Sequence, residues 1–348
     1  MLVGFWEHVS AAYRVCLQEI AQAAKPGEAA QPERTLLVAR ALRALASEGK
    51  TMHLRYLPVP PRVWQELAQL YGEAEKEHVV AGLVKAYATD VLHTNARQEF
   101  LRLPMIVAAS PGSEHLLEME LSARIVAQLA GGFALHAQPD ADCNFCVDLA
   151  QPAVPVRHKP ETPATATMRY FGAAQARVVI QEIIDRYTAN PKEPEKRFGD
   201  DYSIQEKLVV LKRLLLYWGE SPPQQRWPRV KLEAKIKVAH GFSAASELVT
   251  RIEFSGMAEM TADQRVKVKQ QTGIALQAEE ATAAITEWME RDGSTWGVGV
   301  DIPRQDEPWA KIGTLCTLQA AGHKTWWLGA IRRLQRDPHD HVHAGIEI

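Results

Sequence analysis

A short polar segment, Asp292-Gly293-Ser294-Thr295-Trp296-Gly297, separates two runs that have the composition of β-strands, residues 286–289 and 296–302. Aspartate, serine and glycine favour turns, and the first two place a carboxylate and a hydroxyl close together. A turn of this kind can present both groups to one edge of a ligand. The segment therefore predicts two neighbouring strands joined by a turn that binds a ligand.

The strand pattern continues on both sides of this segment. Residues 231–238 alternate between charged and apolar side chains, which predicts a half-buried antiparallel strand. The other predicted strands are residues 285–289, 296–302, 313–318, 326–334 and 342–348. Several short strands separated by turn residues predict a small antiparallel β-barrel over residues 221–348, with an insertion at about residues 243–284 that we interpret as partly helical.

The first part of the chain has a different pattern. In residues 35–46 and 64–76 the apolar side chains recur at the i, i+3 and i+4 spacing of amphipathic helices. We predict a mainly helical domain over residues 1–150, a proline-rich linker over 151–167 and a helical segment over 168–220. The fold class is therefore an α+β multidomain protein, helical first and a β-barrel last.

The amino-acid composition limits the kinds of binding partner and the cellular compartment that we expect. The chain has 348 residues, of which 46% are hydrophobic and 24% charged, and its net charge is −2. This balance is ordinary for a globular protein and favours neither DNA nor RNA as a partner. Four cysteines are typical of a reducing compartment, and no apolar run approaches the ~20 residues of a membrane helix. We expect a cytoplasmic protein without a signal peptide and without membrane insertion.

Charge and tryptophan are unevenly distributed along the chain. Residues 207–237 contain eight basic and two acidic residues, and seven of the nine tryptophans follow residue 217. Basic and aromatic side chains together suit a ligand that is both anionic and aromatic. We expect most of these tryptophans to form the barrel core.

Three motifs occur in a fixed order in the last third of the chain. Arg226 and Arg229 precede the first predicted strand, residues 292–297 fit the pattern [D/N]xSxxG, and the chain ends in Gly345-Ile346-Glu347-Ile348. This order resembles the PilZ domain, a bacterial β-barrel family that binds cyclic di-GMP, over about residues 222–348. The family carries RxxxR before its first strand, whereas Gln225 stands here at the first arginine position.

The resemblance implies cyclic di-GMP as the ligand, with no other cofactor and no metal ion. Arginine binds phosphate bidentately and also matches guanine, and an aspartate can accept the N1–H and N2–H donors of guanine. Arg332 and Arg333 are candidates to supply the charge that Gln225 lacks, and Gly297 would let the ligand approach the backbone. The predicted site residues are Gln225, Arg226, Trp227, Arg229, Asp292, Ser294, Trp296, Gly297, Arg332 and Arg333.

We therefore predict a receptor rather than an enzyme, since no phosphate-binding loop, nucleophile elbow or metalloprotease motif is present in the sequence. The helical region would pass the signal to an unidentified protein partner, and homo-oligomer formation stays open. The alternative is a helical scaffold or chaperone-like interaction protein whose barrel no longer binds the ligand, which Gln225 favours.

Two further groups of residues have side chains that metals bind. Cys143 and Cys146 form a single CxxC pair, near His136 and His158, and we interpret them as buried thiols. The second group lies between the last two predicted strands, and we interpret it as a polar loop. It consists of Asp337, His339, Asp340, His341 and His343.

Overall fold

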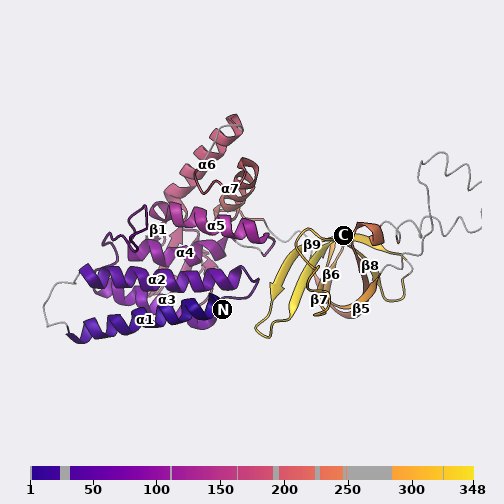
Figure 1. The fold of residues 1–348 in the computed structure, drawn as a ribbon, viewed down its shortest axis with the longest axis horizontal. Coiled ribbons are helices and arrows are strands. Elements are labelled where there is room, and N and C mark those ends of the chain that lie inside the picture. Colours follow the sequence, from indigo (N-terminus) through magenta and orange to yellow (C-terminus); the bar gives the residue numbers. More distant parts are fainter. Residues whose placement is uncertain are drawn as a thin grey trace, which may run out of the picture. The chain divides into compact units, whose positions relative to one another are not determined.

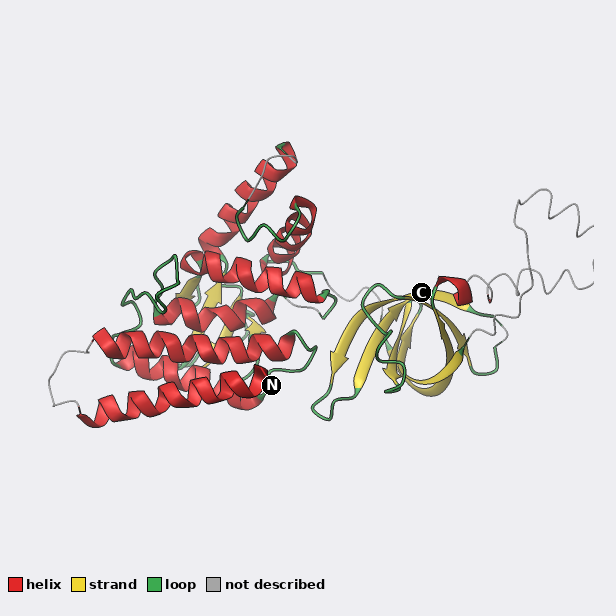
Figure 2. Ribbon diagram, in the orientation of Figure 1, coloured by secondary structure: helices red, strands yellow, loops and turns green. Residues whose placement is uncertain are grey.

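The chain folds into two compact units, Met1–Gln224 and Gln225–Ile348 (Figure 1). The computed structural model describes residues 2–23, 32–109, 112–162, 164–190, 196–223, 228–245, 248, 284–323 and 325–348. Figure 2 shows helices throughout the first unit and a β-barrel in the second. The predicted fold class, a helical region followed by an antiparallel barrel, is therefore confirmed.

The first unit is built mainly from helices. They are α1 (Leu2–Ala23), α2 (Pro32–His53), α3 (Pro61–Lys76), α4 (Ala96–Ala108), α5 (Leu116–Leu129), the 3₁₀ turn η1 (Ala130–Gly132), α6 (Ala174–Ala189) and α7 (Ile204–Trp218). Capping side chains in the local sequence mark the first turn of two of these helices. Asn95 caps α4 by accepting a hydrogen bond from the Gln98 amide, and Ser203 caps α7 together with Glu206. Across the described residues, no helix combines the length and apolarity that crossing a membrane requires.

A four-stranded antiparallel sheet completes this unit. Its strands are β1 (Ala134–His136), β2 (Phe145–Asp148), β3 (Val156–Arg157) and β4 (Met168–Gly172), in the order β1-β4-β2-β3. The helical interpretation of residues 168–172 is wrong, because Tyr170 and Phe171 are buried in a strand between β1 and β2. Residues 151–167, interpreted as a linker, contain β3, and one hydrophobic core includes residues from both sides of this segment.

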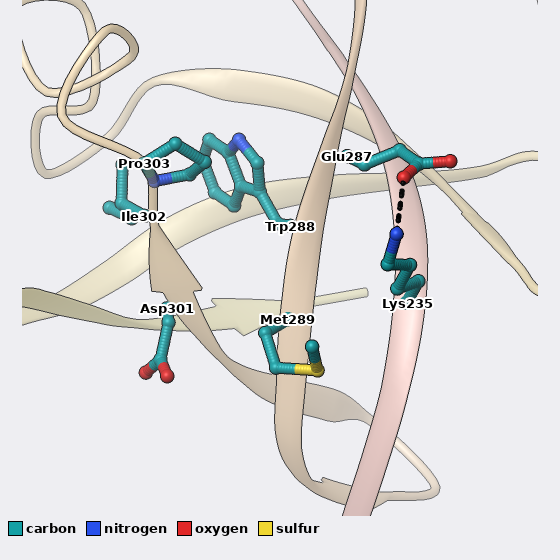
Figure 3. Close-up of a pocket in the computed structure, with 7 residues that line it drawn as sticks. All are labelled: Lys235, Glu287, Trp288, Met289, Asp301, Ile302 and Pro303. Atoms are coloured by element: carbon teal, nitrogen blue, oxygen red, sulfur yellow. Dashed lines mark hydrogen bonds and ion pairs between the residues drawn. The ribbon is translucent and has the colours of Figure 1, made fainter.

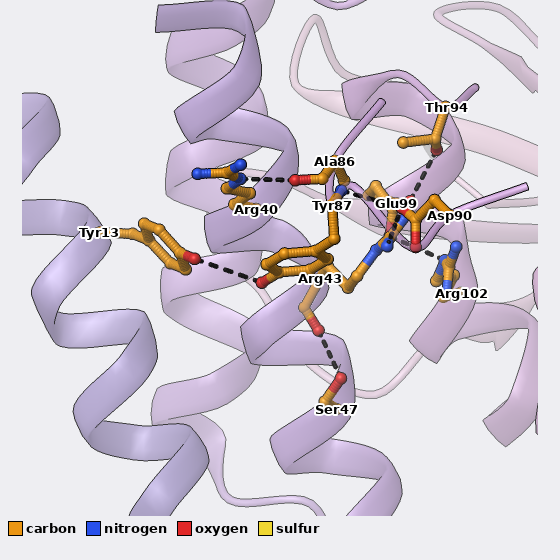
Figure 4. Close-up of polar contacts among 10 residues, drawn as sticks. All are labelled: Tyr13, Arg40, Arg43, Ser47, Ala86, Tyr87, Asp90, Thr94, Glu99 and Arg102. Atoms are coloured by element: carbon orange, nitrogen blue, oxygen red, sulfur yellow. Dashed lines mark hydrogen bonds and ion pairs between the residues drawn. The ribbon is translucent and has the colours of Figure 1, made fainter. Parts of the chain in front are cut away.

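A buried polar network attaches the segment between α3 and α4 to helix α2 (Figure 4). Glu99 of α4 is fully buried and accepts hydrogen bonds from Arg43 at 2.7 and 3.0 Å and from Thr94 at 2.6 Å. Arg102 approaches the same carboxylate at 2.7 Å, and Arg43 also binds Asp90 at 2.6 Å. The burial of this carboxylate is therefore compensated by two guanidinium groups and a hydroxyl.

The second unit is a closed barrel in which every neighbouring pair of strands is antiparallel. Its strands are β5 (Val230–His240), β6 (Ile285–Ser294), β7 (Gly297–Ile302), β8 (Leu315–Ala320), β9 (Trp327–Arg336) and β10 (Val342–Glu347), in the order β10-β7-β6-β5-β8-β9. The predicted strands are confirmed. The insertion predicted at about residues 243–284 lies almost entirely outside the described residues.

The prediction that most of the late tryptophans form the barrel core is confirmed only in part, because Trp218 is buried in the core of the first unit and Trp296 is exposed. Trp288 is buried, and Trp309 stacks on it with ring centroids 5.2 Å apart. Both indole N–H groups donate to the buried carboxylate of Asp306, at 2.7 Å from Trp288 and 3.2 Å from Trp309. This shared acceptor satisfies two indole donors at one end of the core.

Candidate functional site

The residues of the [D/N]xSxxG pattern lie on strands rather than in a turn. Strand β6 continues through Asp292 to Ser294, and only residues 295–296 form the turn to β7. Ser294 pairs with Gly297 across the hairpin, and its hydroxyl donates to the Gly297 carbonyl oxygen at 3.2 Å. Strand pairing thus fixes the residues of the pattern, and the side chains of Asp292 and Ser294 both lie on the outer face of the barrel.

A row of cross-strand neighbours runs over this outer face. Asp292 of β6 pairs with Gly299 of β7, Gly299 with Gly345 of β10, and Gly345 with Arg333 of β9. Directly opposed residues of antiparallel strands point to the same face of the sheet. This glycine row, Asp292-Gly299-Gly345-Arg333, therefore places two residues without side chains between a carboxylate and a guanidinium.

Asp292 forms an ion pair with Arg229, the residue just before β5. The two side chains are 35% and 36% exposed, so water and a ligand can reach both. A Cβ atom at Gly299 would lie only 2.6 Å from a carboxylate oxygen of Asp292. Gly299 therefore provides the space in which the carboxylate lies.

Arg332 and Arg333 both point outward because β9 contains a β-bulge. Gly345 opposes Arg333 whereas the next residue, Ile346, opposes Ile331, so that Arg332 is an extra residue on β9. In a regular strand one of two successive side chains would point into the barrel. The bulge places both arginines at the end of the glycine row, and Arg332 contacts Glu347 at 2.7 Å.

Gly297 and Trp296 have different surroundings. A Cβ atom at Gly297 would lie 2.6 Å from the carbonyl oxygen of Ile346, so that glycine allows β7 and β10 to pack closely. Trp296 is 55% exposed beside it. The Trp296 indole thus lies on the surface next to the pattern. Packing between β7 and β10 is by itself enough to require glycine at position 297.

Three of the predicted site residues, Gln225, Arg226 and Trp227, lie outside the described residues. The other seven are all on the barrel unit. The structure brings Arg229 to Asp292 and Ser294 to Gly297, and strand pairing connects Asp292 with Arg333 through the two glycines.

A second polar group next to the glycine row was not predicted from the sequence. Asp301 of β7 opposes His343 of β10, and their side chains approach to 2.6 Å. Arg291 contacts the same carboxylate at 2.5 Å. Asp301 lies two residues after Gly299 and His343 two residues before Gly345, so that strand alternation from the two glycines could have identified them.

A shallow pocket of about 280 Å³ lies on strands β5 to β7 (Figure 3). An exposed ion pair between Lys235 and Glu287, at 3.1 Å, forms part of its lining. Its other lining residues are Trp288, Met289, Asp301, Ile302 and Pro303. This pocket is a second place on the same strands where a small ligand can contact the barrel.

The cysteine pair matches its interpretation as buried thiols. Cys143 is 3% exposed and Cys146 is fully buried. Burial, together with the nearby Asp140 and Asp142, raises the pKa of the Cys143 thiol to about 12, and burial also raises the pKa of Cys146. Thiols of this kind stay protonated at neutral pH and react slowly as nucleophiles.

Two histidines at the start of the last strand and just before it pair with aspartates. His341 contacts Asp337 at 3.1 Å, and the ring of His343 lies between Asp301 and Asp337. Backbone N–H groups of residues 339 and 341 also donate to Asp337, and hydrogen bonding lowers the pKa of this carboxyl. These contacts support the interpretation of residues 337–341 as a polar loop, whereas assigning His343 to the same loop is wrong, because His343 lies on strand β10 and pairs with Asp301 of β7.

Comparison with known families gives information on the other unit. Residues 1–140 match the model of a family described as the N-terminal domain of the cyclic-di-GMP receptor FimW. No curated protein matches the chain. The helical unit is therefore similar, over these residues, to part of a cyclic di-GMP receptor.

Proposed function

We propose that this protein is a receptor that binds cyclic di-GMP on the outer face of the barrel, along the glycine row. The proposal rests on one arrangement on the outer face of the barrel. The ion pair of Arg229 and Asp292 lies at one end of the glycine row, and the outward side chains of Arg332 and Arg333 lie at the other. The family match of residues 1–140 supports the same ligand from a separate part of the chain.

The chemistry of the row fits a dinucleotide with two phosphates and two guanines. The Asp292 carboxylate can accept the N1–H and N2–H donors of a guanine edge, while arginines bind phosphate oxygens or guanine O6 and N7. In the structure Arg229 is paired with Asp292. We propose that the ligand replaces Arg229 as the hydrogen-bond partner of the Asp292 carboxylate, and that the Arg229 guanidinium then binds the ligand.

The two glycines at the centre of the row would let the ligand lie against the strands. Glycine inside a strand contributes no packing and often marks close approach of a ligand or another backbone. Arg332 and Arg333 lie at the far end of the row, where they would neutralise the phosphates in place of the arginine that Gln225 replaces. Trp296 is exposed and available to stack on a base.

We propose a non-enzymatic mode of action. The ligand would favour one arrangement of the chain over another, which requires that the two arrangements differ in affinity for it. The helical unit would then present the changed state to a protein partner. Hydrogen exchange in residues 1–140 should change on addition of cyclic di-GMP if this proposal holds.

Calorimetry with the full chain tests ligand binding. Cyclic di-GMP should bind the wild type, and Asp292→Ala should weaken binding at least about 100-fold, since each lost hydrogen bond to a charged group is worth roughly 1.5–3 kcal/mol. Arg229→Ala should weaken it to a similar degree, and Arg333→Ala at least about tenfold. A smaller salt dependence of binding should accompany both arginine variants.

The ion pair of Lys235 and Glu287 is a matched control, because it joins the same two strands and is exposed. Lys235→Ala and Glu287→Ala should leave the affinity unchanged. If these variants weaken binding while Asp292→Ala does not, the ligand occupies the pocket of Figure 3 instead. No heat and no thermal shift at ligand excess would favour the scaffold alternative.

A further inference from the structure

The loop between β1 and β2 brings three side chains together that are common metal ligands. His136 is the last residue of β1, and Asp140 and Cys143 lie in the loop. The sulfur of Cys143, a ring nitrogen of His136 and a carboxylate oxygen of Asp140 all lie within 4.8 Å of one another. Thiolate, imidazole and carboxylate together are a typical donor set for Zn²⁺.

The spacing of the three groups is close to that of a tetrahedral site. Metal–ligand bonds of about 2.0–2.3 Å place two ligand atoms roughly 3.6 Å apart around zinc. Separations of 4.8 Å or less therefore have to close by at most about an ångström. His136 and Asp140 are exposed and can rotate, whereas Cys143 is buried and provides a stationary donor.

The loop that carries these residues is held in place by backbone contacts. The Cys143 amide donates to the Asp140 carbonyl at 3.0 Å, and the Asp142 amide donates to the Asp140 carboxylate at 3.0 Å. The carbonyl oxygen of Asp142 lies directly against Gly172 of β4, where any side chain would clash. The strands before and after the loop both pair with β4. Loop geometry is thus largely set before a cation binds.

We propose that His136, Asp140 and Cys143 form a binding site for a thiophilic divalent cation of the Zn²⁺ type, and that binding of the cation releases the proton of the Cys143 thiol to solvent. Three protein ligands leave the fourth position open for water or for a donor from a partner. Because β1 is the edge strand of its sheet, the cation would tie this edge to the loop that enters β2. The site lies in the helical unit and does not depend on the proposed function of the barrel.

Titration of the full chain with Zn²⁺ and Co²⁺ tests the site. One equivalent of Co²⁺ should give a thiolate-to-cobalt charge-transfer band, which Cys143→Ser should abolish. His136→Ala and Asp140→Asn change exposed side chains, and asparagine keeps an oxygen that can accept the Asp142 amide hydrogen bond, so we expect both variants to fold. Each should weaken Zn²⁺ binding at least about tenfold, because even residues that only support a metal ligand contribute a factor of 10–100.

Two cysteines provide the controls. Cys16 is exposed on α1, and Cys146 is the other member of the CxxC pair. Cys16→Ser and Cys146→Ala should both keep the charge-transfer band and the Zn²⁺ affinity. The assignment is overturned if the wild type shows no band, if Cys143→Ser keeps it, or if His136→Ala and Asp140→Asn bind Zn²⁺ as tightly as the wild type.

Discussion

Replacing Glu99 by glutamine should strongly destabilise the helical unit. The Glu99 carboxylate is fully buried and contacts the guanidinium groups of Arg43 and Arg102 and the hydroxyl of Thr94 (Figure 4). Glutamine keeps the shape but loses the charge, and its amide nitrogen is a donor that faces guanidinium donors. Arg102 would then lose its ion pair with Glu99, while Arg43 would keep its ion pair with Asp90.

The magnitude follows from the burial of these groups. Burial lowers the pKa of Arg102, which indicates how costly its charge is without a partner. Removing one member of a buried ion pair typically costs about 3–5 kcal/mol, since the other charge is left uncompensated. In a unit of roughly 150–250 residues each kcal/mol lowers the melting temperature by about 2–4 °C, which corresponds to roughly 6–20 °C here.

Urea and thermal unfolding of the full chain, followed by the helical circular dichroism signal, measure this loss. Glu120→Gln is the matched control, because Glu120 forms a half-exposed ion pair with Lys50 at 2.7 Å. We expect this control to cost less than about 1 kcal/mol. Equal destabilisation of the helical unit by Glu99→Gln and Glu120→Gln would show that the burial of the Glu99 carboxylate does not set the size of the loss.

Three further predictions concern single residues. Gly297→Ala should destabilise the barrel by about 1–3 kcal/mol in urea unfolding, because the new Cβ atom would lie 2.6 Å from the Ile346 carbonyl oxygen. Gly345→Ala should cost less, because its Cβ atom would meet a side-chain atom at 3.3 Å. Equal losses of stability in the two variants would contradict this prediction. Asp306→Ala should cost about 2–4 kcal/mol by the same assay, because two indole N–H groups lose their acceptor; an unchanged midpoint would contradict it. Burial, followed by nearby positive charge, lowers the pKa of His53 to about 4, below the unfolded value of about 6.5. The unfolded chain therefore binds a proton that the folded chain does not between pH 6.5 and 4, and the free energy of unfolding should fall by up to about 3 kcal/mol as pH falls through this window. His53→Gln should reduce this dependence, and an unchanged pH profile would argue against it.

The strands of the barrel were predictable because side-chain alternation is a local property. The charged and apolar side chains of residues 231–238 alternate, and the structure buries Ile236 and Val238 on the inner face of β5. The helix caps at Asn95 and Ser203 are local in the same way. By contrast, residues 168–172 form a strand only because β1 and β2 lie on either side of them.

For the candidate site too, some features are local in the sequence and others depend on contacts between distant segments. The residue types of the site can be read from the sequence alone, since the [D/N]xSxxG spacing is visible in residues 292–297. The folded chain is needed to see that Arg229 contacts Asp292 and that two glycines lie between Asp292 and Arg333. It is also needed to see that a β-bulge turns both Arg332 and Arg333 outward. Strand register and bulges depend on packing between segments far apart in the chain, so that no local pattern contains them.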